Sequence, residues 1–147
     1  MKLFLDTSVL LAACGSHLGA SRALFHLSPK TGWVLMTSPY AISEVARNLP
    51  RFSGTATAVW AGLRPQLTVV DDVVALDFPT VFSASKDRPI LFTALAWSPM
   101  LLTLDREDFI GLLGGQFYGL RIRLPYEFLE EERAAGRLLF PHPQTTD

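Results

Sequence analysis

The chain has 147 residues, of which 49% are hydrophobic and 18% are charged. This length is typical of one domain, and this composition gives no reason to expect a disordered chain, because enough apolar surface is present to form a core. With 13 basic and 14 acidic residues, the formal net charge is −1. The chain therefore lacks the strong basic charge of many nucleic-acid-binding domains, although a local basic patch remains compatible with this balance.

The sequence contains one cysteine, Cys14, within the apolar run Val9–Cys14. A lone cysteine forms neither an internal disulfide nor a cysteine zinc site, so we expect a small buried side chain and a reducing compartment. Asp6 interrupts the apolar N-terminus and no small-residue cleavage site follows, which is unlike a signal peptide. No apolar run approaches the roughly 20 residues that span a bilayer. These features predict a cytoplasmic protein without membrane contact.

The first half of the chain alternates strand patterns with helix patterns. Continuous apolar runs predict buried strands, and apolar residues spaced by three and four positions predict helices. The expected strands are Lys2–Asp6, Trp33–Thr37 and Leu67–Val70, and the expected helices are Gly19–Ser28, a helix from the cap Ser38 to Pro50, and Thr55–Leu63. The predicted core faces are Ala20, Ala23, Leu24 and Leu27 in the first helix, Ile42, Val45, Ala46 and Leu49 in the second, and Ala56, Val59, Trp60 and Leu63 in the third. Pro29–Gly32 and Ser53-Gly54 are expected to form turns or loops.

The second half continues the alternation. Asp71-Asp72 is interpreted as turn chemistry, and Val73–Ser85 as a stretch with a short helix. Helices are expected at Asp87–Trp97, Asp108–Leu113 and Pro125–Ala135, and strands at Met100–Leu104 and Leu120–Leu124. Trp60 and Trp97 are expected in the core, and the acids Glu130–Glu132 on the surface or in caps. The whole pattern predicts an α/β fold with three layers, a parallel sheet of about five strands flanked by helices. We expect one domain over residues 1–140 and a frayed tail over residues 141–147.

Four carboxylates lie where the predicted strands end or the predicted helices begin: Asp6, Glu44, Asp87 and Asp105. An ionised carboxylate beside apolar segments is costly, and several together repel one another. A hard divalent cation such as magnesium offsets both effects. Because ligand sites of parallel α/β sheets form at the carboxyl ends of strands, we expect these acids to converge there.

Each acid also has a structural explanation. Asp6 fits a turn, and Asp87 and Asp105 fit helix or turn caps. On its helix, Glu44 lies about 200° from Ile42 and therefore points away from the apolar face. It could pair there with Arg47 on a solvated surface.

Five stretches resemble the PIN-domain nucleases, and in particular the VapC-like toxins of toxin–antitoxin pairs. They are LDTSVLLAA (Leu5–Ala13), SPYAISEVARNL (Ser38–Leu49), SKDRPILFTALAW (Ser85–Trp97), LLTLDREDF (Leu101–Phe109) and RLPYEFLEE (Arg123–Glu131). The resemblance implies a parallel sheet in strand order 3-2-1-4-5 and a site in which Asp6, Glu44, Asp87 and Asp105 bind Mg²⁺ or Mn²⁺. It also implies hydrolysis of RNA phosphodiester bonds, a homodimer, and a small cognate antitoxin as partner.

Under this interpretation other polar residues take supporting roles. Ser8 and Thr103 carry hydroxyl groups on short side chains and could orient a carboxylate. Asp108 is a further acid near the proposed site. Four arginines near the acids are candidates for RNA phosphates: Arg47, Arg51, Arg88 and Arg106.

Other functions remain open. The main alternative is a non-catalytic module on the same fold that binds RNA or protein and keeps the acids as caps. A histidine-driven ribonuclease is disfavoured because His17, His26 and His142 form no obvious pair. A phosphatase with a nucleophilic aspartate is disfavoured because it usually has a second acid two positions after the first, where this chain has Ser8. A receiver domain is also disfavoured, because it typically needs an early acidic pair and a late lysine, and neither is visible.

Overall fold

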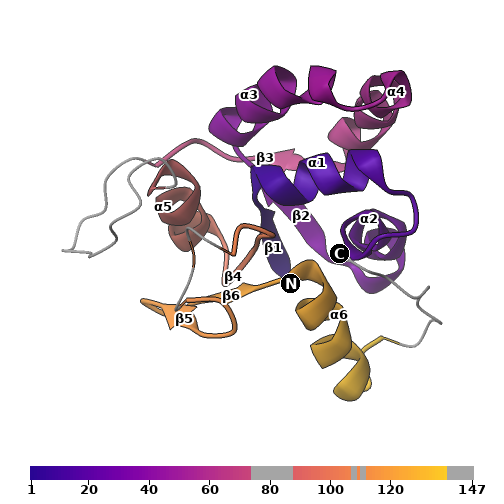
Figure 1. Ribbon diagram of the computed structural model, residues 1–147. Helices are drawn as coiled ribbons and strands as arrows, with labels where there is room; N and C mark the ends of the chain where they lie inside the picture. Colours follow the sequence, from indigo (N-terminus) through magenta and orange to yellow (C-terminus); the bar gives the residue numbers. More distant parts are fainter. Residues whose placement is uncertain (74–87, 107–108, 110–111, 139–147) are drawn as a thin grey trace.

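The central feature is a mostly parallel sheet in the order β3-β2-β1-β4-β6-β5 (Figure 1). The computed structural model describes residues 1–73, 88–106, 109 and 112–138. The strands are β1 (Lys2–Leu5), β2 (Val34–Thr37), β3 (Thr68–Val69), β4 (Met100–Leu102), β5 (Gln116–Phe117) and β6 (Leu120–Arg123). All neighbours pair in parallel except β5 and β6. The predicted order of five parallel strands is confirmed, and β5 is an antiparallel edge strand that was not predicted.

The turn between β5 and β6 explains this additional strand. Tyr118 and Gly119 both have positive φ, at 50° and 89°. Two consecutive residues in that region form the tight turn whose twist suits an antiparallel hairpin. The sequence signal is weak because a tyrosine rarely takes a positive φ.

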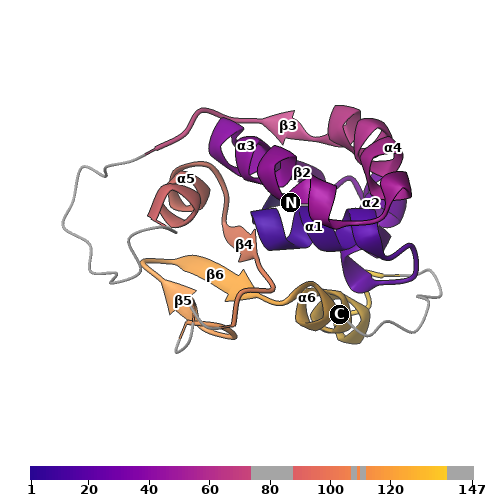
Figure 2. The same ribbon diagram turned by 45° about the horizontal axis from the view of Figure 1, so that its top comes forward.

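Helix α1 (Thr7–Gly15) was not predicted, although it lies at the centre of the fold. Its sequence TSVLLAACG is apolar on nearly every side, so it shows no amphipathic period. The structure accounts for this composition, because α1 packs against α2, α3 and α4 as well as following β1 (Figure 2). Cys14 is buried in this helix as expected, and burial raises the pKa of its thiol.

Helix α2 (Ala20–Thr31) is longer than the sequence suggested. Its predicted core face is buried, but the expected turn at Pro29–Gly32 is wrong because Pro29 lies inside the helix. Proline cannot donate to the carbonyl four residues earlier. The Ser28 hydroxyl, 3.4 Å away, donates to that carbonyl of Phe25 instead, and the helix ends at Gly32 with φ of 78°.

The next helices are α3 (Pro39–Asn48) and α4 (Gly54–Leu63), each followed by a short 3-10 turn, η1 (Leu49–Arg51) and η2 (Arg64–Gln66). Ser38 caps α3 as expected, by accepting a hydrogen bond from the Ala41 N–H. One predicted core residue is wrong: Ala46 is exposed, and Ala41 is buried in α3 instead. In α4 the predicted face is confirmed, with Trp60 buried.

Helix α5 (Arg88–Trp97) and helix α6 (Pro125–Ala134) complete the layers. Trp97 is 41% exposed rather than in the core, and its indole N–H donates to the Asp71 carbonyl over 3.0 Å. Glu132 is buried rather than exposed, and it forms an ion pair with Arg137. The predicted helix at Val73–Ser85 lies, apart from Val73, outside the described residues, as do parts of Asp108–Leu113 and the predicted tail.

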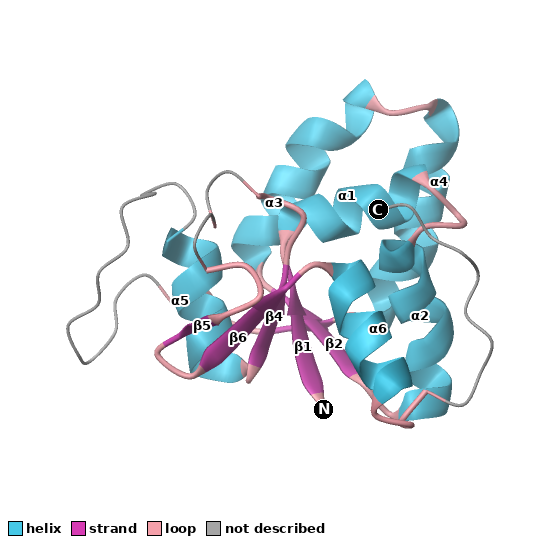
Figure 3. Ribbon diagram, turned by 60° about the horizontal axis from the view of Figure 1, so that its bottom comes forward, coloured by secondary structure: helices cyan, strands magenta, loops and turns pink. Residues whose placement is uncertain are grey.

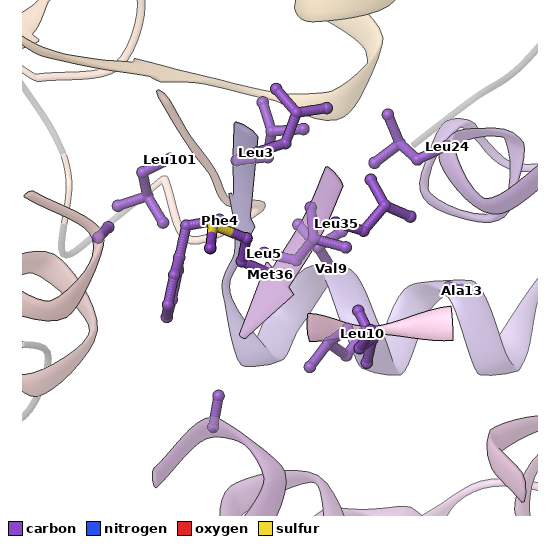
Figure 4. Close-up of a cluster of buried hydrophobic side chains, with 14 of the residues drawn as sticks. Leu3, Phe4, Leu5, Val9, Leu10, Ala13, Leu24, Leu35, Met36 and Leu101 are labelled. Carbon is purple, nitrogen blue, oxygen red and sulfur yellow. The ribbon is translucent and has the colours of Figure 1, made fainter. Parts of the chain in front are cut away.

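The helices flank the sheet. Helices α2 and α6 lie side by side next to β1 and β2, and α5 lies against β4 (Figure 3). Apolar side chains from β1, β2, β4, α1 and α2 gather between these layers, including Phe4, Leu35 and Leu101 (Figure 4). None of the described helices combines the length and the apolar character needed to cross a bilayer. The assignment of one domain with a frayed tail stays a prediction.

Candidate functional site

Asp6 lies directly after β1 and begins α1. Its backbone N–H donates to the Leu102 carbonyl over 3.0 Å, which continues the pairing of β1 with β4. Its Oδ1 accepts a 2.7 Å hydrogen bond from the Thr7 N–H, so Asp6 is the N-cap of α1. The side chain is 5% exposed. Asp6 therefore occupies the predicted place, at the carboxyl end of a central strand.

Two hydroxyls hold the other oxygen of Asp6. Thr103 Oγ1 donates to Oδ2 over 2.6 Å and Ser8 Oγ donates to it over 3.0 Å. Each hydroxyl also accepts a backbone hydrogen bond, Ser8 from Leu104 and Thr103 from Asp105, both at 3.0 Å. In these backbone bonds each hydroxyl oxygen is the acceptor, so its single proton is free to be donated to the carboxylate. The predicted orienting role of Ser8 and Thr103 thus has a geometric basis.

The pKa of Asp6 is raised from 3.8 to about 6. Desolvation by burial is the main cause, and the negative charge of Glu44 adds to it. The hydrogen bonds from Thr103, Ser8 and the Thr7 N–H act in the opposite direction and only partly compensate. At neutral pH the site therefore contains a buried negative charge that a cation would stabilise.

Glu44 reaches the same region from α3. Its Oε1 accepts a 2.8 Å hydrogen bond from Thr7 Oγ1, although Thr7 lies 37 residues earlier in the chain. Within the described part of the chain Glu44 forms no ion pair, so the suggested pairing with Arg47 is not observed. Glu44 is half-buried, whereas Arg47 and Arg51 are exposed. The prediction that Glu44 points away from the apolar face is not confirmed, because this contact joins it to the buried Thr7 and it lies next to the buried Ala41 and Val45 on α3.

The structure describes only some of the remaining candidate residues. Asp105 is half-buried just beyond β4, and its backbone N–H joins it to the hydroxyl network through Thr103. Asp87 and Asp108 lie outside the described residues, and so does the side chain of Arg88. Arg106 is exposed beside Asp105.

Asp72 and two histidines lie outside the candidate site. Asp72 Oδ1 accepts a 3.2 Å hydrogen bond from the Tyr40 N–H at the start of α3, which gives Asp72 a structural role. The interpretation of Asp71-Asp72 as a turn is not confirmed, because neither residue lies in a turn. His17 and His26 are both exposed, and neither has a partner in the network around Asp6.

Thr7 is the residue that sequence reasoning missed. It is 8% exposed and touches both acids, through its backbone N–H to Asp6 and through its hydroxyl to Glu44. The only sequence signal was its place between Asp6 and Ser8. Its contact with α3 depends on how α1 and α3 pack.

Comparisons with known proteins bear on the fold. No family model matches the chain, and no curated protein matches it in sequence. Among solved structures, a chain in the crystal structure of VapBC2 from Rickettsia felis bound to a DNA fragment from their promoter superposes with a TM-score of 0.60. The match covers 83% of this chain and 97% of that chain at 14% identity. This chain is similar in fold to the VapBC2 chain. At this identity the likeness establishes the α/β fold with a mostly parallel, helix-flanked sheet, and no more.

The donor chemistry fits a hard divalent cation. Asp6 and Glu44 offer only oxygen ligands, and the raised pKa of Asp6 marks a charge that protein hydrogen bonds leave undercompensated. Over the described ranges, no three acidic, histidine or cysteine side chains are grouped so as to hold a metal. Magnesium commonly uses one or two carboxylates and keeps several waters, so a site with few protein ligands is compatible with its chemistry.

Proposed function

We propose that this chain is a metal-dependent endoribonuclease that hydrolyses RNA phosphodiester bonds and acts as the toxin of a type II toxin–antitoxin system. The observation that supports it most directly is the link from Asp6 through Thr7 to Glu44 at the carboxyl end of β1. This link brings two carboxylates from distant segments into one network despite the cost that repulsion adds to the ionisation of Asp6.

In this proposal Asp6 and Glu44 hold Mg²⁺ or Mn²⁺ directly or through water, and Asp105 and Asp87 complete the ligand set. The cation would supply Lewis-acid activation of water and neutralise charge on the scissile phosphate. Ser8 and Thr103 fix the orientation of Asp6, so that its lone pairs are preorganised. Asp108 is proposed as a further supporting acid.

The exposed side chains of Arg47, Arg51 and Arg106 are proposed to contact RNA phosphates, together with Arg88. Arg47 and Arg51 lie on α3 and on the turn that follows it, and Arg106 follows Asp105. These arginines therefore follow two of the proposed ligands, Glu44 and Asp105, in the sequence.

The proposed partners follow from the same comparison. The solved neighbour is a VapBC complex on promoter DNA, which supports a small antitoxin as a partner of this chain. A homodimer and a cytoplasmic location belong to the proposal as well. Exposed apolar side chains such as Leu18, Phe52 and Tyr126 offer surface for such contacts.

A non-catalytic RNA- or protein-binding module is the second candidate. The observation that favours it is that Asp6 already caps α1 and accepts three hydrogen bonds, which is sufficient to explain an acid at this position. In that case the carboxylates would need no cation.

RNA cleavage separates the two functions. Purified protein is incubated with single-stranded and structured RNA in Mg²⁺, in Mn²⁺ and in EDTA, alongside Glu44→Gln, Asp105→Asn and the control Asp71→Asn. Asp71 is exposed and contributes only its backbone carbonyl to a hydrogen bond, so its substitution should leave cleavage intact. The nuclease proposal predicts metal-dependent cleavage that Glu44→Gln and Asp105→Asn abolish. Equal cleavage by all variants would indicate a contaminant, and RNA binding without cleavage would support the module.

A further inference from the structure

We infer that Thr7 is a positioning residue for the proposed cation site, because its hydroxyl fixes the carboxylate of Glu44 beside Asp6. This inference rests on the proposed function, and it assigns a role to a residue that touches no reacting group. Thr7 acts through Glu44, and its effect should disappear when the Glu44 carboxylate is removed.

The direction of the hydrogen bond supports this role. A threonine hydroxyl has one proton, and here it is donated to Glu44 Oε1 over 2.8 Å. Glu44 Oε1 is therefore the acceptor of this bond. Oε2 accepts no hydrogen bond from the described residues, so one oxygen is fixed by the protein and the other stays available for a ligand.

The conformation of Glu44 is otherwise hard to explain. The side chain is half-exposed and long, so it could extend into water and lower its repulsion with Asp6. Arg47, one turn further along α3, could also attract it. It instead turns toward Thr7, which follows Asp6, and its negative charge adds to the burial that raises the pKa of Asp6. The hydrogen bond from Thr7 is the contact that holds it there.

The side chain of Thr7 is suited to hold this geometry. Thr7 is buried at the first position of α1, and a β-branched side chain has few χ1 rotamers there. The same residue donates its backbone N–H to Asp6 Oδ1 over 2.7 Å. One rigid residue thus sets the relative placement of two carboxylates, one from the end of β1 and one from α3.

The chain allows a selective substitution. Thr7→Val keeps the shape and the backbone N–H to Asp6 but removes the hydroxyl, and Glu44 can then be solvated because it is half-exposed. Thr7→Ser keeps the hydroxyl and loses the methyl group. Thr31→Val serves as a matched control, since the Thr31 hydroxyl donates to the Leu27 carbonyl at the end of α2 and contacts neither acid.

The experiment measures Mn²⁺ affinity by isothermal titration calorimetry at pH 7.5, with folding checked by circular dichroism. We expect Thr7→Val to weaken Mn²⁺ binding about tenfold, as loss of a supporting hydrogen bond around a metal typically does, and Thr7→Ser to recover most of it. Thr31→Val should bind like the wild type. In a Glu44→Gln background, Thr7→Val should produce little further loss.

Two results would overturn the inference: unchanged Mn²⁺ affinity in Thr7→Val, or an equal loss with and without the Glu44 carboxylate. The second result would mean that Thr7 acts through Asp6 or through the fold. If the wild-type protein binds no Mn²⁺ at all, the proposed function fails, and the inference fails with it. If the wild type binds Mn²⁺ and Thr7→Val binds it with the same affinity, only the role of Thr7 is contradicted.

Discussion

Thr103 Oγ1 and Asp6 Oδ2 are joined by a 2.6 Å hydrogen bond that connects residues 97 positions apart, from the ends of two adjacent strands. This bond is the largest of the contacts that lower the pKa of Asp6. We therefore expect Thr103→Val to raise the pKa of Asp6 above about 6 and to cost about 1–3 kcal/mol of unfolding free energy at pH 7. Carbon-13 NMR titration of the Asp6 carboxyl measures the pKa, and Thr103→Ser should restore it. An unchanged pKa in Thr103→Val would contradict the assignment.

The pH dependence of stability should carry a contribution from Asp6. Its folded pKa of about 6 exceeds the ordinary value of 3.8, so the folded state binds the proton more tightly than the unfolded chain. The resulting stabilisation is present below pH 3.8 and is lost as the pH rises through 6. At about 1.4 kcal/mol per pH unit, the loss is roughly 3 kcal/mol.

Urea denaturation in EDTA at several pH values between 3.5 and 7.5 measures this contribution. Asp6→Asn cannot titrate at this position, so its unfolding free energy lacks this contribution. The unfolding free energy of the wild type should therefore fall relative to that of the variant as the pH is raised. A difference that stays constant with pH would show that the pKa of Asp6 is ordinary.

Divalent cations should stabilise the protein at neutral pH if the proposed site exists. A ligand that binds only the folded state adds about 2.7 kcal/mol at a concentration of 100 times its Kd. We expect Mn²⁺ to raise Tm at pH 7.5, and to raise it less at pH 5, where Asp6 is largely protonated. Glu44→Gln should reduce the shift, and Asp71→Asn should not. Equal shifts in all proteins would place the bound cation elsewhere.

Substitutions in the core should be far more costly than those at the sheet edge. Phe4 is fully buried in β1, between β2 and β4, so Phe4→Ala should destabilise by about 3–5 kcal/mol. Val69 is 48% exposed in β3, and Val69→Ala should cost less than about 1 kcal/mol. Chemical denaturation of both variants gives the comparison, and similar losses would argue against the central place of β1.

Much of the fold followed from local patterns. The apolar runs of β1, β2 and β4 and the periodic faces of α2 and α4 are strong signals, because burial selects those residues whatever their tertiary partners. Helix α1 was missed because it is buried on most sides and therefore has no polar face to reveal its period. Trp97 was misplaced for a related reason: α5 has almost no polar residues, so its sequence does not show which side is exposed.

The candidate site was predictable only in part. The position of Asp6 at a strand end could be inferred, since the strand and the acid are adjacent in sequence. The contact of Thr7 with Glu44 could not, because it depends on the packing of α1 against α3. No local pattern encodes the angle between two helices that are joined through a third helix and a strand.

Because Asp6 also caps α1, replacing this acid with a residue that cannot cap a helix would disturb the start of the most central helix. Glu44 has no such structural role, since its side chain caps neither end of α3. An inactive form for testing the proposed binding of RNA or of an antitoxin by co-crystallisation is therefore best made as Glu44→Gln, which preserves the fold and removes a proposed cation ligand. Substitutions that abolish the proposed activity should leave the protein folded at Glu44, and should destabilise it at Asp6 when the new side chain cannot cap α1.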